Sequence, residues 1–119
     1  AIAPSAPFLN DYRDYFALVD WPGNWILQAA QEQNIPVEEL YVTLSYFDVK
    51  NFTDRIQCPV LMAIGLQDPV CPPHTNFAGF NHIKAEKSWI CYPEAGHNVW
   101  EQKGWPEAKQ KFLDSFLWE

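Results

Sequence analysis

The fold is decided by residues 59–68, PVLMAIGLQD. Their apolar run is continuous rather than alternating, which is typical of a strand buried on both faces of a parallel sheet. A second apolar stretch, residues 88–92 (SWICY), follows after a helical segment. A strand, a helix and a second strand in succession form a parallel unit, so we expect a parallel sheet covered by helices on both faces. The predicted class is α/β.

Prolines and apolar spacing mark the helices around these strands. We expect helices over residues 25–33 (after Asn24 as N-cap), 36–46 and 73–83, a helical turn over 51–56, and a last helix from Pro106. The expected core-facing positions are Val37, Leu40, Tyr41, Leu44, Phe77, Phe80, Ile83, Ala108, Phe112, Leu113, Phe116 and Leu117. Residues 1–9 are a third candidate strand, although two prolines weaken that prediction. About three parallel strands flanked by helices are therefore expected.

Composition narrows the function classes. The chain has 119 residues, enough for one domain, and its 48% hydrophobic and 16% aromatic content is typical of a packed core. A formal net charge of −7 and scattered basic residues argue against nucleic acid and anionic membrane surfaces as partners. No apolar run approaches the roughly 20 residues that span a bilayer, and no signal-peptide pattern precedes the first strand.

An acidic residue and a histidine follow the two predicted strands. Asp68 ends the first stretch, and His97 follows the second across the turn 93–96, with Gly96 expected to let the backbone turn sharply. The carboxyl ends of parallel strands meet at one edge of a sheet, where ligands bind. Either residue alone is more often an ordinary loop residue. Together, 29 positions apart with one helix and one strand between them, they have the order of the acid and histidine of a Ser-Asp-His hydrolase.

Other residues allow competing interpretations. A zinc site could be assembled from Cys71, His74, Cys91 and His97, but the second pair lacks the compact spacing of a structural zinc motif. The six tryptophans could form a sugar-stacking platform, although burial of most of them in the core is favoured. The three cysteines, Cys58, Cys71 and Cys91, cannot all pair and are expected to be buried free thiols.

Five segments together resemble the acetyl xylan esterase and cephalosporin-C deacetylase family. They are residues 6–11 (APFLND), 44–51 (LSYFDVKN), 58–68 (CPVLMAIGLQD), 70–82 (VCPPHTNFAGFNH) and 92–97 (YPEAGH). The block from 46 to 73 is the most specific of them, whereas Gly96-His97 alone would be weak evidence. The resemblance runs over nearly all of this chain but only about the C-terminal third of a family member.

The resemblance implies an α/β-hydrolase fold and removal of acetyl groups from xylo-oligosaccharides or similar small acetyl esters. By position, Asp68 matches the family's acid and His97 its histidine. The family uses a serine nucleophile and no metal or other cofactor. None of the serines here lies in a Gly-x-Ser-x-Gly turn. Residues 1–119 are therefore expected to be a single domain that corresponds to the C-terminal part of the enzyme, without the part that bears the nucleophile.

Two expectations follow for the isolated chain. Without the serine and the oxyanion donors it should be inactive as an esterase. Its sheet should also have an unpaired edge, which we expect to be covered by self-association, by rearranged segments or by pairing with the missing N-terminal part. Members of the family often assemble as oligomers. The alternatives are a non-catalytic module that binds a carbohydrate or a protein, and a zinc-linked structural domain.

Overall fold

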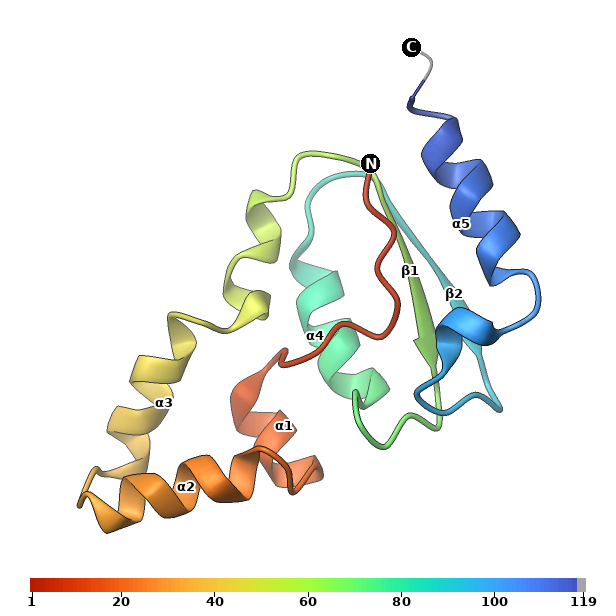
Figure 1. The fold of residues 1–119 in the computed structure, drawn as a ribbon. Coiled ribbons are helices and arrows are strands. Elements are labelled where there is room, and N and C mark those ends of the chain that lie inside the picture. The colour runs from red at the N-terminus through yellow and green to blue at the C-terminus, as the bar shows by residue number, and fades with distance from the viewer. Residues whose placement is uncertain (118–119) are drawn as a thin grey trace.

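A computed structural model describes residues 1–117. Figure 1 shows its elements along the chain. The helices are α1 (Tyr12–Leu18), α2 (Gly23–Glu32), α3 (Val37–Ser45), α4 (Pro73–His82) and α5 (Trp105–Asp114), and the strands are β1 (Val60–Gly65) and β2 (Lys87–Tyr92). Short 3-10 turns cover Val49–Asn51, Thr53–Arg55 and Val99–Glu101.

The two strands predicted from their apolar runs form a parallel pair. Their register runs from Val60 opposite Lys87 to Gly65 opposite Tyr92. Helix α4 makes the crossover between them, as parallel strands require. The carboxyl ends of both strands therefore lie at the same edge of the sheet.

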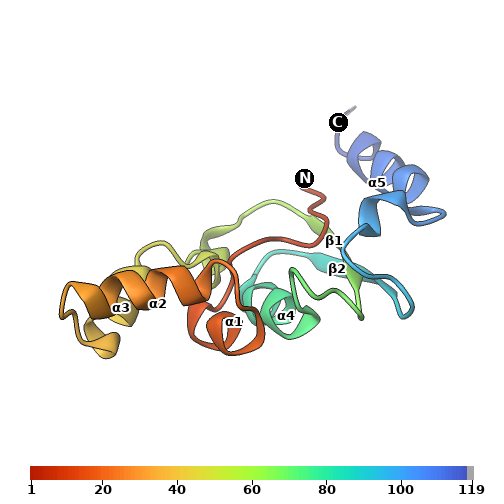
Figure 2. The same cartoon turned by 60° about the horizontal axis from the view of Figure 1, so that its bottom comes forward.

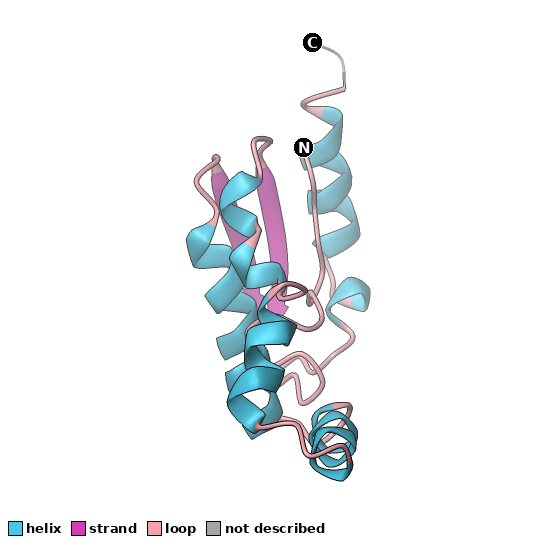
Figure 3. Ribbon diagram, turned by 90° about the vertical axis from the view of Figure 1, so that its left-hand side faces the viewer, coloured by secondary structure: helices cyan, strands magenta, loops and turns pink. Residues whose placement is uncertain are grey.

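Strand β1 is apolar throughout because each of its faces is covered by a different helix. Leu61 and Ala63 belong to a cluster that includes Trp105 of α5. Val60, Met62 and Ile64 pack on the opposite face with Phe80 of α4 and Ile83. Figures 2 and 3 show α4 and α5 on opposite sides of the strands. The expectation of a parallel sheet with helices on both faces is confirmed.

The predicted strand over residues 1–9 is only partly right. The chain runs parallel to β1 through two isolated bridges, Ile2 with Val60 and Ser5 with Ala63. The carbonyl oxygen of Pro4 accepts a hydrogen bond from Ala63 N at 3.0 Å, but proline has no backbone N–H to donate in return. At Ala6 the φ angle becomes 44°, which ends the extended conformation. The sheet thus has two regular strands and a bridged N-terminal segment, residues 1–6, instead of three full strands.

Residues 12–45 form a three-helix unit, called the helical lobe below. Tyr12, Tyr15 and Phe16 of α1 form its buried centre. Helix α1 was not predicted, although these residues have the i, i+3, i+4 spacing of a helix face. Helix α2 begins at Gly23 after Pro22, and Asn24 is not its cap but donates to Asp20 Oδ1 at 3.2 Å. Helix α3 follows Pro36 as expected, yet none of its residues is fully buried.

The tryptophans depart from the expectation that most of them are core. Trp105 is buried, whereas four others are exposed: Trp21, Trp25, Trp89 and Trp100. The sixth, Trp118, lies outside the described residues. Trp89 is 53% exposed although its ring meets Phe77 and Phe80 of α4 edge to face, because it lies in β2, the edge strand of the described sheet.

The last helix is buried along less of its length than predicted. Trp105 and Phe112 pack against the sheet cluster. Phe116 and Leu117 lie beyond the end of α5 and are exposed. Helix α5 therefore packs against the sheet through its first two turns.

The cysteines are free thiols, with Cys71 buried and Cys58 and Cys91 half-buried. Within residues 1–117, every helix is too short or too polar to cross a bilayer. The Cα radius of gyration is 16.1 Å, compared with about 13.5 Å for a compact domain of this length. The chain is therefore more extended than a self-contained domain of the same size.

Candidate active site

Asp68 and His97 lie in two loops that are joined directly beyond the strands. Leu66 N donates to Tyr92 O at 3.1 Å, and Gln67 N donates to Ala95 O at 3.0 Å. These bonds continue the pairing of β1 and β2 past the last regular residue of each strand. They bring the loops together although 29 positions separate the two side chains.

Gly65, the last residue of β1, makes this close approach possible. A Cβ added at Gly65 would lie 2.3 Å from Gly96 O and 2.7 Å from Ala95 O, far inside contact distance. Gly96, the glycine expected from the sequence to allow the turn, is under no such constraint. At Gly96 the nearest atom to an added Cβ is Gln67 O at 3.8 Å, which is an ordinary contact. The glycine that the geometry requires is therefore Gly65.

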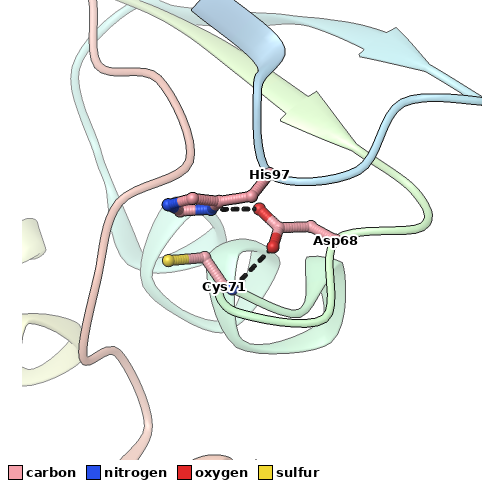
Figure 4. A group of neighbouring side chains, drawn as sticks. All are labelled: Asp68, Cys71 and His97. Carbon is pink, nitrogen blue, oxygen red and sulfur yellow. Dashed lines mark hydrogen bonds and ion pairs between the residues drawn. The ribbon is translucent and has the colours of Figure 1, made fainter.

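The two predicted residues form a hydrogen-bonded pair (Figure 4). His97 Nδ1 lies 2.9 Å from Asp68 Oδ2. The Asp68 side chain is 1% exposed and that of His97 is 35% exposed. An ionised carboxylate only accepts hydrogen bonds, so this contact favours the neutral tautomer that has its proton on Nδ1 and its lone pair on Nε2. The pair thus combines a buried carboxylate with a partly accessible imidazole.

The second oxygen of Asp68 is held by the backbone. Asp68 Oδ1 accepts from Val70 N and Cys71 N, both at 2.8 Å. Three N–H donors therefore satisfy the buried carboxylate, as burial of a charge requires. Because both oxygens are fixed, the carboxylate has a defined orientation toward the imidazole.

Two residues that the sequence analysis did not identify brace this loop. Tyr15 Oη of α1 donates to Val70 O at 2.9 Å. Asn76 Nδ2 of α4 donates to Cys71 O at 2.7 Å. Burial, and secondarily the nearby Cys71 and Asp68, raises the pKa of Tyr15 to about 12. The phenol therefore stays protonated and remains a donor. No motif marks such contacts, because Tyr15 and Val70 are 55 positions apart.

Trp100 lies against the histidine. Its ring meets the His97 ring edge to face, with 5.2 Å between centroids and 88° between planes. Such pairs contribute about 0.5–1.5 kcal/mol. The indole is also exposed to solvent, so it both restrains the imidazole and forms part of the surface beside it.

The four residues of the alternative zinc site are not brought together. Cys71 Sγ lies with Asp68 and His97, the three ligand atoms being within 4.8 Å of one another. His74 instead lies beside Asp14, with Nε2 2.7 Å from Oδ2. Cys91 packs against the cluster on the α4 face of the sheet. Burial, and secondarily Asp68, raises the pKa of Cys71 to about 12.

The model of the family described as acetyl xylan esterase (AXE1) matches residues 1–115. The chain belongs to the acetyl xylan esterase family. This confirms the resemblance seen in the sequence.

Related proteins agree with this assignment. The acetyl esterase Axe7A of Xylanibacter ruminicola is 40% identical over 65 residues, which are 55% of this chain and 15% of that protein. Acetyl xylan esterase 1 from Thermoanaerobacterium sp. JW/SL YS485 superposes with a TM-score of 0.81 at 32% identity, covering 94% of this chain and 37% of the other. The acetyl xylan esterase from Paenibacillus sp. R4 superposes with a TM-score of 0.82 at 36% identity, covering 97% of this chain and 37% of the other.

The fold is that of the α/β-hydrolases, and nearly all of this chain matches. The chain spans little more than a third of each of these two esterases and about one seventh of Axe7A.

Proposed function

We propose that this chain supplies the aspartate and the histidine of a carbohydrate acetyl esterase. Asp68 orients His97, and His97 Nε2 takes the proton from a serine as that serine attacks the acetyl carbonyl. The imidazolium then returns the proton to the leaving sugar hydroxyl. The substrates are acetylated xylo-oligosaccharides or similar small acetyl esters. The observation that carries the proposal is the 2.9 Å bond between buried Asp68 and accessible His97.

The serine comes from a polypeptide segment outside residues 1–119. This chain has four serines, Ser5, Ser45, Ser88 and Ser115, and none is hydrogen-bonded to His97. Ser45 and Ser115 instead donate to carbonyls of their own helices. Removal of one triad member costs about 10⁴–10⁶ in rate, and each missing oxyanion donor roughly another 10²–10³. The isolated chain is therefore expected to be inactive.

The open edge of the sheet offers a docking position for that segment. The carbonyl oxygens of Ile2 and Pro4 accept hydrogen bonds from backbone N–H groups of β1. Among the backbone bonds between described residues outside regular elements, none involves Ala3 or Ser5. Their N–H and C=O groups therefore leave an edge that a further parallel strand can extend. We assign this edge to the segment that bears the nucleophile, which also accounts for the extended shape of the chain.

Exposed aromatic residues favour a second candidate, a non-catalytic carbohydrate-binding module. Trp21 and Trp25 are exposed on the helical lobe, and Trp21 stacks against Phe8 at 6.1 Å. A module of that kind has no need for a buried carboxylate bonded to a histidine. The esterase is therefore the better supported function.

The test combines covalent labelling with hydrolysis. The purified chain, alone and with any protein that copurifies with it, is treated with a fluorophosphonate serine-hydrolase probe and analysed by intact mass. Acetyl release from acetylated xylo-oligosaccharides is measured in the same samples. The chain alone should carry no adduct and release no acetate above background. A copurifying protein that bears the serine should be labelled.

Variants identify the role of the histidine. In the active assembly, His97→Gln should lower acetyl release by about 10⁴. His82→Gln is the matched control, because His82 is exposed on α4 and its ring is hydrogen-bonded to the backbone carbonyl of Lys50. Acetyl release by His82→Gln should stay within twofold of the parent. An adduct on a serine of this chain, or full activity of His97→Gln, would overturn the proposal.

A further inference from the structure

Cys71 has no part in the proposed esterase mechanism, yet its thiol lies beside both residues of the pair. Figure 4 shows the three side chains together, with Cys71 directed alongside the imidazole. One donor atom each from Asp68, Cys71 and His97 lies within 4.8 Å of the other two. A thiol, an imidazole and a carboxylate converging in this way are the donor set of a thiophilic divalent metal ion.

We infer that Asp68, Cys71 and His97 form a binding site for Zn²⁺ and similar thiophilic divalent cations. Zinc binds nitrogen at about 2.0–2.1 Å and sulfur at about 2.3 Å, so tetrahedral donors lie roughly 3.3–3.8 Å apart. Donor atoms at the 4.8 Å limit would approach by about 1.0–1.5 Å, whereas His97 Nδ1 and Asp68 Oδ2, which are 2.9 Å apart, would separate slightly. Three protein donors leave a fourth position for solvent, as in open zinc sites.

Charge and access also suit a cation. Binding breaks the S–H bond of Cys71 and releases that proton to water as the metal–sulfur bond forms. The ion also takes the place of the proton on His97 Nδ1, the nitrogen that faces Asp68, and the imidazole regains a proton from water at Nε2. No oxidation state changes. The thiolate and the Asp68 carboxylate then neutralise the two positive charges of the ion. The chain as a whole carries a formal charge of −7, which attracts cations. The His97 side chain is 35% exposed, so an ion can reach the cluster from solvent on that side, whereas Cys71 is buried.

The ligand positions are braced by the fold. Cys71 N and Val70 N hold Asp68 Oδ1, and Asn76 Nδ2 holds Cys71 O. Such bracing reduces the entropy lost on binding. A bound ion would hold His97 through Nδ1 and leave the proton on Nε2, so it would prevent His97 from acting as a base. That consequence rests on the proposed function, whereas the site itself does not.

The experiment titrates Cd²⁺ into the purified, tag-free and reduced chain and follows the ultraviolet cadmium–thiolate charge-transfer band. One equivalent of Cd²⁺ should produce the band, and Zn²⁺ should compete it away. Cys71→Ser should abolish the band and weaken Cd²⁺ binding at least 100-fold. Cys58→Ser, which removes a half-buried thiol elsewhere, is the matched control and should bind within twofold of the parent chain.

A second variant keeps the test informative if Cys71→Ser fails to fold. His97→Gln alters a partly exposed side chain and should weaken Cd²⁺ binding at least tenfold while the band still forms at higher concentration. Absence of the band at saturating Cd²⁺, its survival in Cys71→Ser, or parent-like affinity in His97→Gln would overturn the site. The titration needs no serine and no substrate, so its failure would leave the proposed esterase role standing, and failure of the labelling test would leave the metal site standing.

Discussion

The sheet and the outer helices of the helical lobe differ greatly in how much of their apolar surface is buried. All six residues of β1 are buried between α4 and α5. Helix α3 has no fully buried residue, and Trp25 and Val42 of the lobe are 71% and 62% exposed. The Asp68–His97 pair is attached to the first of these regions. Its geometry is therefore fixed by contacts within the chain, whereas the lobe leaves apolar surface uncovered.

A catalytic pair keeps its geometry when it is attached to well-packed elements. Apolar surface of the kind exposed on the lobe is typical of regions that contact another segment, subunit or ligand. The proposed acid–base pair thus lies in the well-packed part of this chain.

The largest expected effect comes from a cavity in the well-packed region. Ile64→Ala removes most of a side chain that is fully buried between β1 and α4. It should lower the free energy of unfolding by about 2–5 kcal/mol. Val42→Ala on α3 should change it by less than about 0.5 kcal/mol, because Val42 is mostly exposed. Urea unfolding of both variants measures the contrast, and equal losses would contradict it.

A second variant acts on the contact between the two site loops. Gly65→Ala places a methyl group 2.3 Å from Gly96 O, so the loops must separate. We expect a loss of about 1–3 kcal/mol and weakening of the Asp68–His97 bond. Gly96→Ala is the control, with 3.8 Å of clearance, and should cost less than about 1 kcal/mol. Chemical unfolding checks the stabilities; a larger loss for Gly96→Ala would show that the two glycines have been assigned the wrong roles.

A third variant removes the link between the two regions. Tyr15→Phe deletes the hydroxyl that donates to Val70 O at 2.9 Å and leaves that carbonyl without this donor. The expected loss is about 1–2 kcal/mol. Tyr46→Phe, at a mostly exposed position after α3, is a control that should have no measurable effect. Thermal unfolding compares the two, and an unchanged Tyr15→Phe would mean that the hydroxyl does not brace the loop.

The same residue predicts an alkaline dependence of stability. The pKa of Tyr15 is raised from 10.0 to about 12 by burial. Below pH 10 the phenol is protonated in both states, so its contribution is fully present. Between pH 10 and 12 the unfolded chain loses this proton first, so stability should fall as pH rises. Tyr15→Phe should show a shallower decline over this range, and identical slopes would contradict the prediction.

The sheet and the positions of the acid and histidine could be predicted because both depend on local sequence. The continuous apolar run of β1 indicates burial on two faces, and residues after parallel strands must share an edge. The bracing by Tyr15 and the requirement at Gly65 depend on residues far apart in the chain, which no local pattern encodes. The tryptophans were predicted wrongly for a related reason, since composition favours burial but does not say which faces have a partner.

The central claim is that the chain itself holds His97 as a base oriented by Asp68. The most direct test is a proton–nitrogen correlation spectrum of the imidazole rings at a pH where histidine is neutral. We predict that His97 carries its proton on Nδ1, with a downfield resonance that is lost in Asp68→Asn, and leaves Nε2 unprotonated. A proton on Nε2 of His97, or a His97 signal unchanged by Asp68→Asn, would contradict the account.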